Sequence, residues 1–182
     1  MRLYLHVSRD KFFNPGDTII NYTYPPGHTV NMLETMLEKD FVDHINKMYK
    51  EGISNHGYQY LVKSINGGYF TNWALEIYFE YVRFREFPDL PSRFQSVFAW
   101  AELADALAFS NIHPIYEIKK EEKGKVLIAD MNLLKTDFNS KRQKEKAMKY
   151  WNGEPADSST DYRPCWEYVI NTPFKIIQQV KW

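Results

Sequence analysis

The chain contains 182 residues, enough for one domain with a substantial core and too few for two comfortable ones. Hydrophobic residues make up 44% of the sequence and charged residues 25%, an ordinary globular mixture. Lys and Arg together number 23, as do Asp and Glu, so the formal net charge is zero. Unspecific binding to nucleic acid therefore lacks its usual electrostatic driver. We expect one domain over residues 1–182.

Cysteine content and hydropathy bear on the compartment. Cys165 is the single cysteine, so an intramolecular disulfide is excluded, which fits a reducing cytoplasm. No segment approaches the roughly 18 apolar residues of a membrane span. The first residues also lack a signal-peptide pattern, because a short strand pattern is followed by charge at Arg9, Asp10 and Lys11. We therefore expect a cytoplasmic protein without a membrane partner.

In the first half of the chain, a short strand pattern precedes two helix patterns. Alternation predicts a strand over residues 2–7, and Asn14–Asp17 has the composition of a turn. Apolar residues recur at spacings of three and four from Val30 to Met48, which predicts a helix there. Thr71 is suited to cap a second helix, which runs to about Arg85 before prolines stop it.

The second half of the chain alternates short strands with two helices. A polar loop rich in Pro, Ser, Asp and Thr separates the second of these helices from the last strands. The elements indicate an α+β fold, with strands at both ends of the chain and helices concentrated in its first half. The expected strands are 94–98, 115–118, 126–129, 166–170 and 174–180, and the expected helices are 100–109 and 140–151.

Two polar residues interrupt apolar strand patterns at opposite ends of the chain. His6 lies within the first strand, and Glu167 lies within the strand that begins at Trp166. Burying such groups is costly without partners, so each is either functional or paired in the core. A paired core histidine is the commoner explanation for His6 alone, and an edge strand would explain Glu167.

Three segments, taken in order, resemble the catalytic domains of poly(ADP-ribose) polymerases, which are ADP-ribosyltransferases of the His-Tyr-Glu type. His6-Val7-Ser8-Arg9 resembles the His-Gly-Ser-Arg segment at the first strand of that family. Ser96-Val97-Phe98-Ala99 is similar to its Tyr-Phe-Ala strand-to-helix junction. Glu167-Tyr168-Val169-Ile170 resembles its Asn-Glu-Tyr-Ile-Val segment. The resemblance implies an ADP-ribosyltransferase-like split, mainly antiparallel sheet with helices inserted in the N-terminal half, in a small, divergent bacterial or phage member.

The resemblance also implies a chemistry for particular residues. Cleaving the bond between nicotinamide and ribose in NAD develops positive charge on the ribose, which a carboxylate stabilises. This catalytic role falls to Glu167, while His6 would bind the adenosine ribose hydroxyls. Guanidinium groups fork onto phosphate oxygens, so Arg9, with Ser8 beside it, would approach the pyrophosphate. Arg93 is a second candidate for the phosphates, with an ordinary surface arginine as the alternative.

The middle segment departs from the family at the position that holds nicotinamide. Val97 stands where the family usually has a stacking aromatic residue. Phe98 is our first choice for that stacking, with Phe94 and Trp100 as alternatives. Ser96 would hydrogen-bond near the carboxamide of nicotinamide.

Other polar residues give weaker signals. Cys165 stands two residues before Glu167, where families that modify arginine side chains usually carry Glu, so arginine is disfavoured as the acceptor. The histidines His44, His56 and His113 show no spacing that suggests a metal site, and none is expected.

We expect an NAD-dependent ADP-ribosyltransferase that passes ADP-ribose to a protein or a nucleic acid, with residues 12–90 setting the choice of acceptor. Three alternatives stay open. The first is an NAD glycohydrolase with water as acceptor. The second is an inactive nucleotide- or partner-binding module, because Val7 replaces the family's glycine. The third is an interaction protein in which His6 and Glu167 are merely paired polar groups. A toxin or defence role would add an inhibitor or antitoxin partner.

Overall fold

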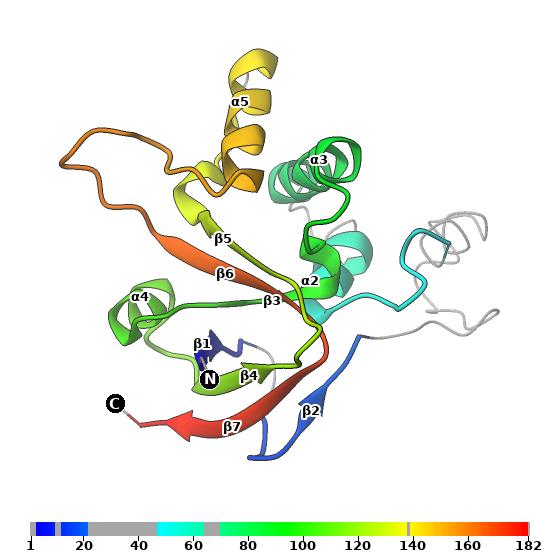
Figure 1. Ribbon diagram of the computed structural model, residues 1–182, viewed down its shortest axis with the longest axis vertical. Helices are drawn as coiled ribbons and strands as arrows, with labels where there is room; N and C mark the ends of the chain where they lie inside the picture. The colour runs from blue at the N-terminus through cyan, green and yellow to red at the C-terminus, as the bar shows by residue number, and fades with distance from the viewer. Residues whose placement is uncertain (1–2, 10–11, 22–46, 64–69, 138, 182) are drawn as a thin grey trace.

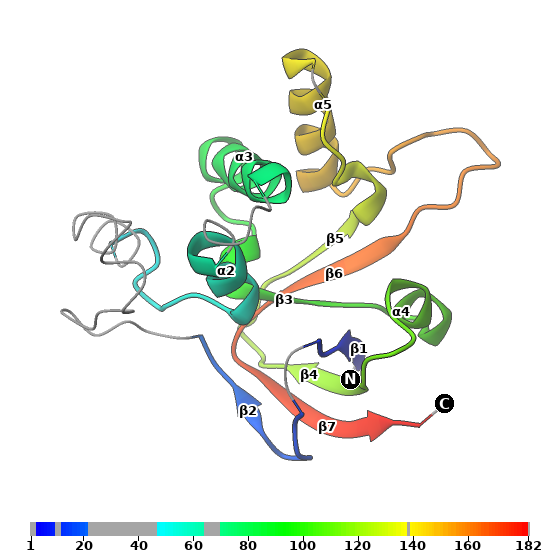
Figure 2. The ribbon, with the colours of Figure 1, turned by 180° about the vertical axis from the view of Figure 1, so that it is seen from behind.

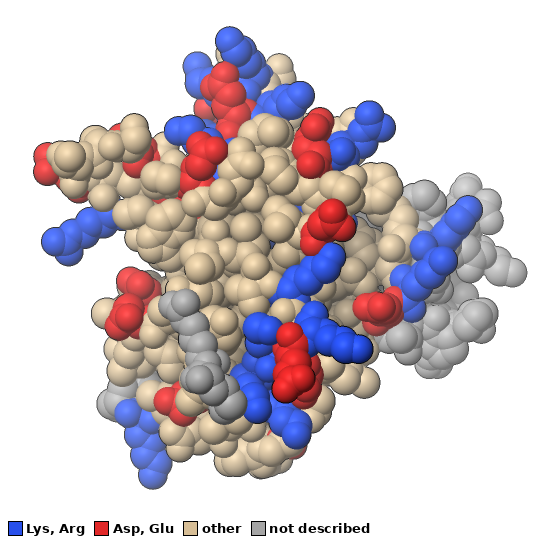
Figure 3. Space-filling model, viewed as in Figure 1, with Lys and Arg blue, Asp and Glu red and all other residues tan. Residues whose placement is uncertain are grey.

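The computed structural model describes residues 3–9, 12–21, 47–63, 70–137 and 139–181. Within these residues the chain forms two antiparallel sheets and a layer of helices (Figures 1 and 2). The α+β class with mainly antiparallel sheets is therefore confirmed. On the face seen in Figure 3, Lys and Arg are interspersed with Asp and Glu, in keeping with the zero net charge.

The first sheet has the strand order β1–β4–β7–β2, and all its neighbours are antiparallel. Its strands are β1 (Tyr4–Val7), β2 (Thr18–Ile19), β4 (Ile115–Lys120) and β7 (Phe174–Val180). The strand β1 lies at one edge, where Leu5 and Trp100 exchange two backbone hydrogen bonds of 2.8 Å. This bridge ties β1 to the end of the second sheet.

The second sheet has the order β3–β6–β5 and is also antiparallel. Its strands are β3 (Ser96–Ala99), β5 (Val126–Asp130) and the central β6 (Trp166–Asn171). Because successive side chains of a strand point to opposite faces, Tyr168 and Ile170 face the first sheet while Glu167 and Val169 face away. A core of aromatic and β-branched side chains fills the space between the sheets. Its buried members are Tyr4, Val97, Ala99, Tyr116, Ile118, Tyr168, Ile170, Phe174 and Ile176.

Helices cover the face of the second sheet that points away from the first (Figure 1). The helices α3 (Phe70–Glu86) and α5 (Ser140–Trp151) pack there around Phe79, Tyr150 and Val169. A short helix, α2 (Asn55–Tyr58), continues into a π-helical turn over Gln59–Lys63, and α4 (Leu103–Phe109) packs beside β1. No helix among the described residues has both the length and the apolar character needed to cross a membrane.

Local signals correctly placed several elements. The strands β1, β4, β5, β6 and β7 occupy the expected segments, and α3 and α5 occupy the expected helical ones. The capping residue expected at the start of α5 is confirmed, because Asn139 Oδ1 accepts from the Arg142 backbone N–H over 3.1 Å. Gly153 follows its end with a φ of +70°, a conformation that favours glycine.

Other expectations were wrong. The expected strand over 94–98 begins at Ser96, because Ser92 Oγ caps a 3-10 turn over Arg93–Gln95. The expected helix over 100–109 begins at Leu103, because the Trp100 backbone is paired with Leu5. Among the described residues, α2 and α3 lie in the first half of the chain and α4 and α5 in the second. The helix expected over 30–48 falls almost wholly outside the described residues.

Candidate functional site

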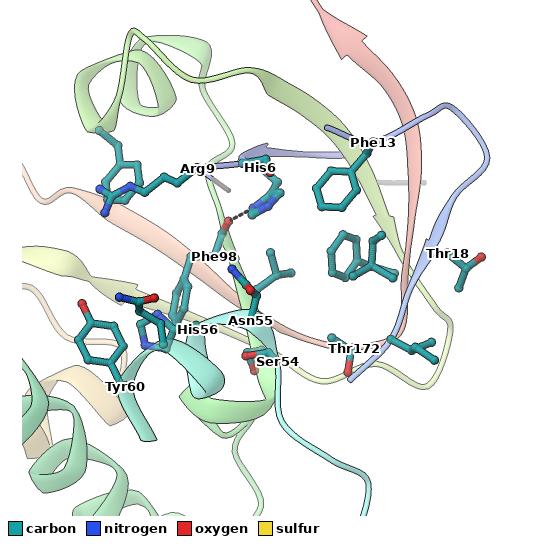
Figure 4. A pocket seen from close by; sticks show the side chains of 18 of the residues that line it. His6, Arg9, Phe13, Thr18, Ser54, Asn55, His56, Tyr60, Phe98 and Thr172 are labelled. Carbon is teal, nitrogen blue, oxygen red and sulfur yellow. Dashed lines mark hydrogen bonds between the residues drawn. The ribbon is translucent and has the colours of Figure 1, made fainter. Parts of the chain in front are cut away.

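A pocket of about 670 Å³ opens between the first sheet, the start of β3 and the α2 segment (Figure 4). Among the described residues that line it, Arg9 is the only side chain with a permanent charge. Five of the seven residues chosen from the sequence line this pocket, and they come from two distant segments. These five are His6, Ser8, Arg9, Ser96 and Phe98.

His6 joins the two segments. Its Nδ1 lies 2.9 Å from the carbonyl oxygen of Phe98, which can only accept, so the proton of the neutral ring is on Nδ1. Burial lowers the pKa of His6 to about 4, although this hydrogen bond opposes the shift. The ring is therefore neutral at physiological pH, and its Nε2 carries a lone pair that accepts hydrogen bonds.

Ser8 and Arg9 continue from β1 along the pocket wall. The Ser8 backbone N–H donates to Pro114 O over 3.0 Å, which fixes the chain as it leaves the strand. Arg9 is exposed, and its guanidinium carbon lies 4.3 Å from the ring centroid of Phe109, which also lines the pocket. The aromatic ring thus holds a cation at this end of the pocket (Figure 4).

Ser96 and Phe98 lie on β3 and differ in what they offer a ligand. Ser96 Oγ lies 2.6 Å from Ser92 O and 2.9 Å from Asn171 Oδ1, so its hydroxyl already has protein partners. Phe98 is half-buried, and its ring centroid lies 4.5 Å from that of His56. Phe98 is therefore the residue of β3 that gives the pocket an aromatic wall.

Glu167 and Arg93 lie outside the lining, in a buried network behind Phe98. Each is only 3% exposed. Arg93 Nη1 donates to Glu167 Oε1 over 2.8 Å, and the Tyr150 hydroxyl donates to the same oxygen over 2.6 Å. Arg93 also donates to Tyr150 Oη. Arg93 is thus neither a surface arginine nor a lining residue, and Glu167 has no direct contact with the pocket.

Glu76, from α3, completes this network. Arg93 Nε and Nη2 donate to its two oxygens over 2.7 and 2.8 Å, a bidentate pair. Burial would raise the pKa of Glu76, but Arg93 and His56 outweigh it and hold the pKa well below its usual range. Burial would likewise lower the pKa of Arg93, but Glu76, Tyr150 and Glu167 raise it well above its usual value. Two carboxylates therefore share one guanidinium.

Two contacts connect the buried network with the pocket. The Arg93 guanidinium carbon lies 4.4 Å from the Phe98 ring centroid. His56 Nε2 lies 3.2 Å from Glu76 Oε2, and the His56 ring lines the pocket. One side chain therefore separates each charged group from the pocket: Phe98 lies in front of Arg93, and His56 lies in front of Glu76. Among the described residues, no group of three or more His, Cys, Asp or Glu side chains is placed to hold a metal ion.

The family model described as "Protein of unknown function (DUF2441)" matches residues 4–182. The chain belongs to the DUF2441 family. No match is found among curated proteins.

Sequence reasoning missed the part of this DUF2441 pocket that α2 and the π-helical turn supply, including Asn55, His56 and Tyr60. A local signal was present, because Ser54 Oγ accepts from the Gly57 N–H over 3.2 Å and so caps the helix. A helix of four residues is too short to show the three- and four-residue spacing of apolar side chains, so the capping residue alone could not predict it. Only the fold brings His56 against Phe98.

Proposed function

We propose that this protein binds NAD in the pocket and transfers ADP-ribose from it to a macromolecular acceptor, with release of nicotinamide. One observation carries the proposal. Residues assigned separately from two short motifs, His6 and Phe98, meet at 2.9 Å although 92 positions separate them in the chain. The meeting point is the wall of a pocket whose volume lies within the usual range for small-molecule sites.

The chemistry of the lining fits the parts of NAD. Arg9 supplies a cation for the pyrophosphate, and its stacking on Phe109 limits the number of positions that the guanidinium adopts. Neutral His6 offers the Nε2 lone pair to a ribose hydroxyl. Phe98, His56 and Tyr60 present aromatic rings, with the Glu76 carboxylate behind them, to the planar cationic nicotinamide.

Glu167 takes the carboxylate role in this proposal. It lies on the same face of β6 as Val169, which stands opposite Phe98 in the β3–β6 pair. To contact the ribose directly, the Glu167 carboxylate has to give up its hydrogen bond from Arg93 and bind the substrate in its place. If that hydrogen bond stays, Glu167 stabilises the positive charge of the ribose only at a distance, from behind Phe98. It then acts together with Glu76 and Arg93, as two carboxylates and one guanidinium.

A second candidate function is nucleotide binding without turnover. The observation that favours it is the burial of Glu167, which is 3% exposed and accepts hydrogen bonds from Arg93 and Tyr150. A carboxylate held in this way serves stability whether or not the pocket is occupied. The lining residues His6, Arg9 and Phe98 would then bind a nucleotide for recognition alone.

The decisive experiment separates binding, cleavage and transfer. Calorimetry with NAD measures binding, release of nicotinamide measures cleavage, and labelled NAD in a cell lysate reveals transfer to a macromolecule. Wild type should show all three, while Glu167→Gln should bind NAD and lose cleavage. Nicotinamide release without a labelled macromolecule would favour an NAD glycohydrolase, and binding without release would favour the recognition module. Full activity in Glu167→Gln would overturn its assignment.

A further inference from the structure

His56 is a pocket residue that no motif assigned. It lies in α2, and its ring centroid is 4.5 Å from that of Phe98 and 4.6 Å from that of Tyr60 (Figure 4). The side chain is 19% exposed, so the ring meets the pocket while most of it is packed. A histidine in such a position is reached by substrate and is also held in one orientation.

The two nitrogens of the His56 ring have different surroundings. Nε2 is fully buried and lies 3.2 Å from Glu76 Oε2, an ion-pair contact that lacks the alignment of a hydrogen bond. The negative charge of a carboxylate at that distance favours the tautomer with its proton on Nε2, because a lone pair there would be repelled, and the lone pair of the neutral ring is then on Nδ1. Arg93 fixes Glu76 through two hydrogen bonds, so the orienting carboxylate cannot turn away easily.

We propose that His56, oriented by Glu76, accepts the proton of the acceptor group during ADP-ribose transfer. This inference rests on the proposed function and adds a residue to it. The His56–Glu76 pair has the arrangement of a base with a carboxylate that orients it and stabilises its charged form.

The step balances in atoms and charge. The acceptor's oxygen or nitrogen forms a bond to the anomeric carbon of the ribose, and the bond from that carbon to nicotinamide breaks. The electron pair of the broken bond goes to the nicotinamide nitrogen and neutralises its positive charge. The acceptor's proton goes to Nδ1 of His56, and the resulting imidazolium lies beside the Glu76 carboxylate.

The other candidate bases are less suitable. His6 has its Nδ1 proton bonded to Phe98 O, and burial of its ring disfavours the charged form. Glu167 already accepts from Arg93 and Tyr150 and does not line the pocket. Among the described residues, the charged and titratable groups around His56 are Glu76 from α3, Tyr60 from the π-helical turn and Arg93 beyond Glu76, and the charge of Arg9 also acts on Tyr60. Burial raises the pKa of Tyr60, which therefore stays neutral.

The test compares His56→Gln with His113→Gln, which alters a half-buried histidine that is bonded to Ser110 and lies outside the lining. In His56→Gln, transfer should fall by about 100-fold or more while the NAD dissociation constant changes little, because base catalysis is lost and binding is not. Added imidazole should restore part of the activity of His56→Ala. His113→Gln should behave as wild type.

The outcomes distinguish this inference from the proposed function. If wild type cleaves NAD and His56→Gln transfers ADP-ribose at the wild-type rate, His56 is not the proton acceptor and the proposed function stands. Loss of NAD binding in His56→Gln, without rescue of His56→Ala by imidazole, would show a packing role instead. If wild type neither binds nor cleaves NAD, the proposed function fails and this inference fails with it.

Discussion

Arg93 donates to the Glu167 carboxylate over 2.8 Å, and both side chains are 3% exposed. The two residues had been assigned separately, one to phosphate binding and the other to catalysis. In the structure they are partners, and Arg93 also donates from Nε and Nη2 to the two oxygens of Glu76. The Arg93–Glu167 pair therefore stabilises the core between the second sheet and its helices. It influences the pocket only through the contact of Arg93 with Phe98 and that of Glu76 with His56.

Replacing Arg93 should destabilise the fold strongly. Arg93→Met leaves Glu76 and Glu167 buried without their common cation, which costs about 3–5 kcal/mol for a buried pair. Urea denaturation of the variant and wild type measures the difference in unfolding free energy. Arg142→Met is the control, because Arg142 forms an exposed ion pair with Asp137 and its loss should leave the midpoint nearly unchanged. Equal stability of Arg93→Met and wild type would contradict the network.

Arg9 should act on ligand binding and not on stability. Arg9→Met removes the exposed cation over Phe109, so NAD should bind about 10- to 100-fold more weakly, the usual loss for a charged hydrogen bond. The salt dependence of the NAD dissociation constant should also weaken, because one charge contact is gone. Calorimetry at two salt concentrations measures both effects. An unchanged affinity would remove Arg9 from the proposed phosphate-binding residues.

The half-buried histidine His6 should make stability depend on pH. Its pKa is about 4 in the folded chain and 6.5 for an unperturbed histidine, so between these values the unfolded chain binds more protons. The unfolding free energy should therefore fall as the pH decreases from about 6.5 to about 4, by roughly 2–3 kcal/mol from this residue. In His6→Gln, which lacks the titrating group, the fall over the same range should be smaller by that amount. Denaturation curves at several pH values test this, and identical pH dependence in the two proteins would refute it.

Gly57 should be intolerant of any side chain. A Cβ at this position would lie 2.3 Å from Phe94 O and 3.0 Å from Ile53 Cβ, so α2 would have to move away from the 3-10 turn. We expect Gly57→Ala to lower the unfolding free energy by about 1–3 kcal/mol and to weaken NAD binding through the neighbouring His56. Gly16→Ala is the comparison, because Gly16 has open space but a φ of +94°. It should lose about 1–2 kcal/mol and keep its NAD affinity.

Asp130 should hold the polar loop that precedes β6. Its carboxylate is fully buried and accepts from the backbone N–H groups of Ala156 and Cys165 and from the Tyr162 hydroxyl. Asp130→Asn turns one acceptor oxygen into a donor that faces other donors, which costs about 1–3 kcal/mol. Limited proteolysis should then cut residues 153–165 faster than in wild type. Asp157→Asn, at an exposed position in the same loop, should leave the cleavage rate unchanged.

Local sequence was sufficient where an element carries its own signals. The helix α5 has a capping Asn139 and ends near Gly153, and β6 and β7 show runs of apolar and β-branched residues. The motifs at His6 and Phe98 also identified residues that line the pocket. These positions were predictable because caps, turns and apolar runs act over a few residues.

Tertiary structure decided which of these elements and residues meet. The strands β4 and β5 follow one another in the chain yet lie in different sheets, since each pairs with a distant strand. Glu167 pairs with Arg93 across 74 positions, and His56 reaches Glu76 through packing of α2 against β3 and the 3-10 turn over Arg93–Gln95. The sequence alone determined the residue types on which the proposed NAD site rests. Long-range packing determined that Arg9, His6 and Phe98 face the pocket while Glu167 lies in the core, because burial and charge pairing depend on neighbours that local sequence does not contain.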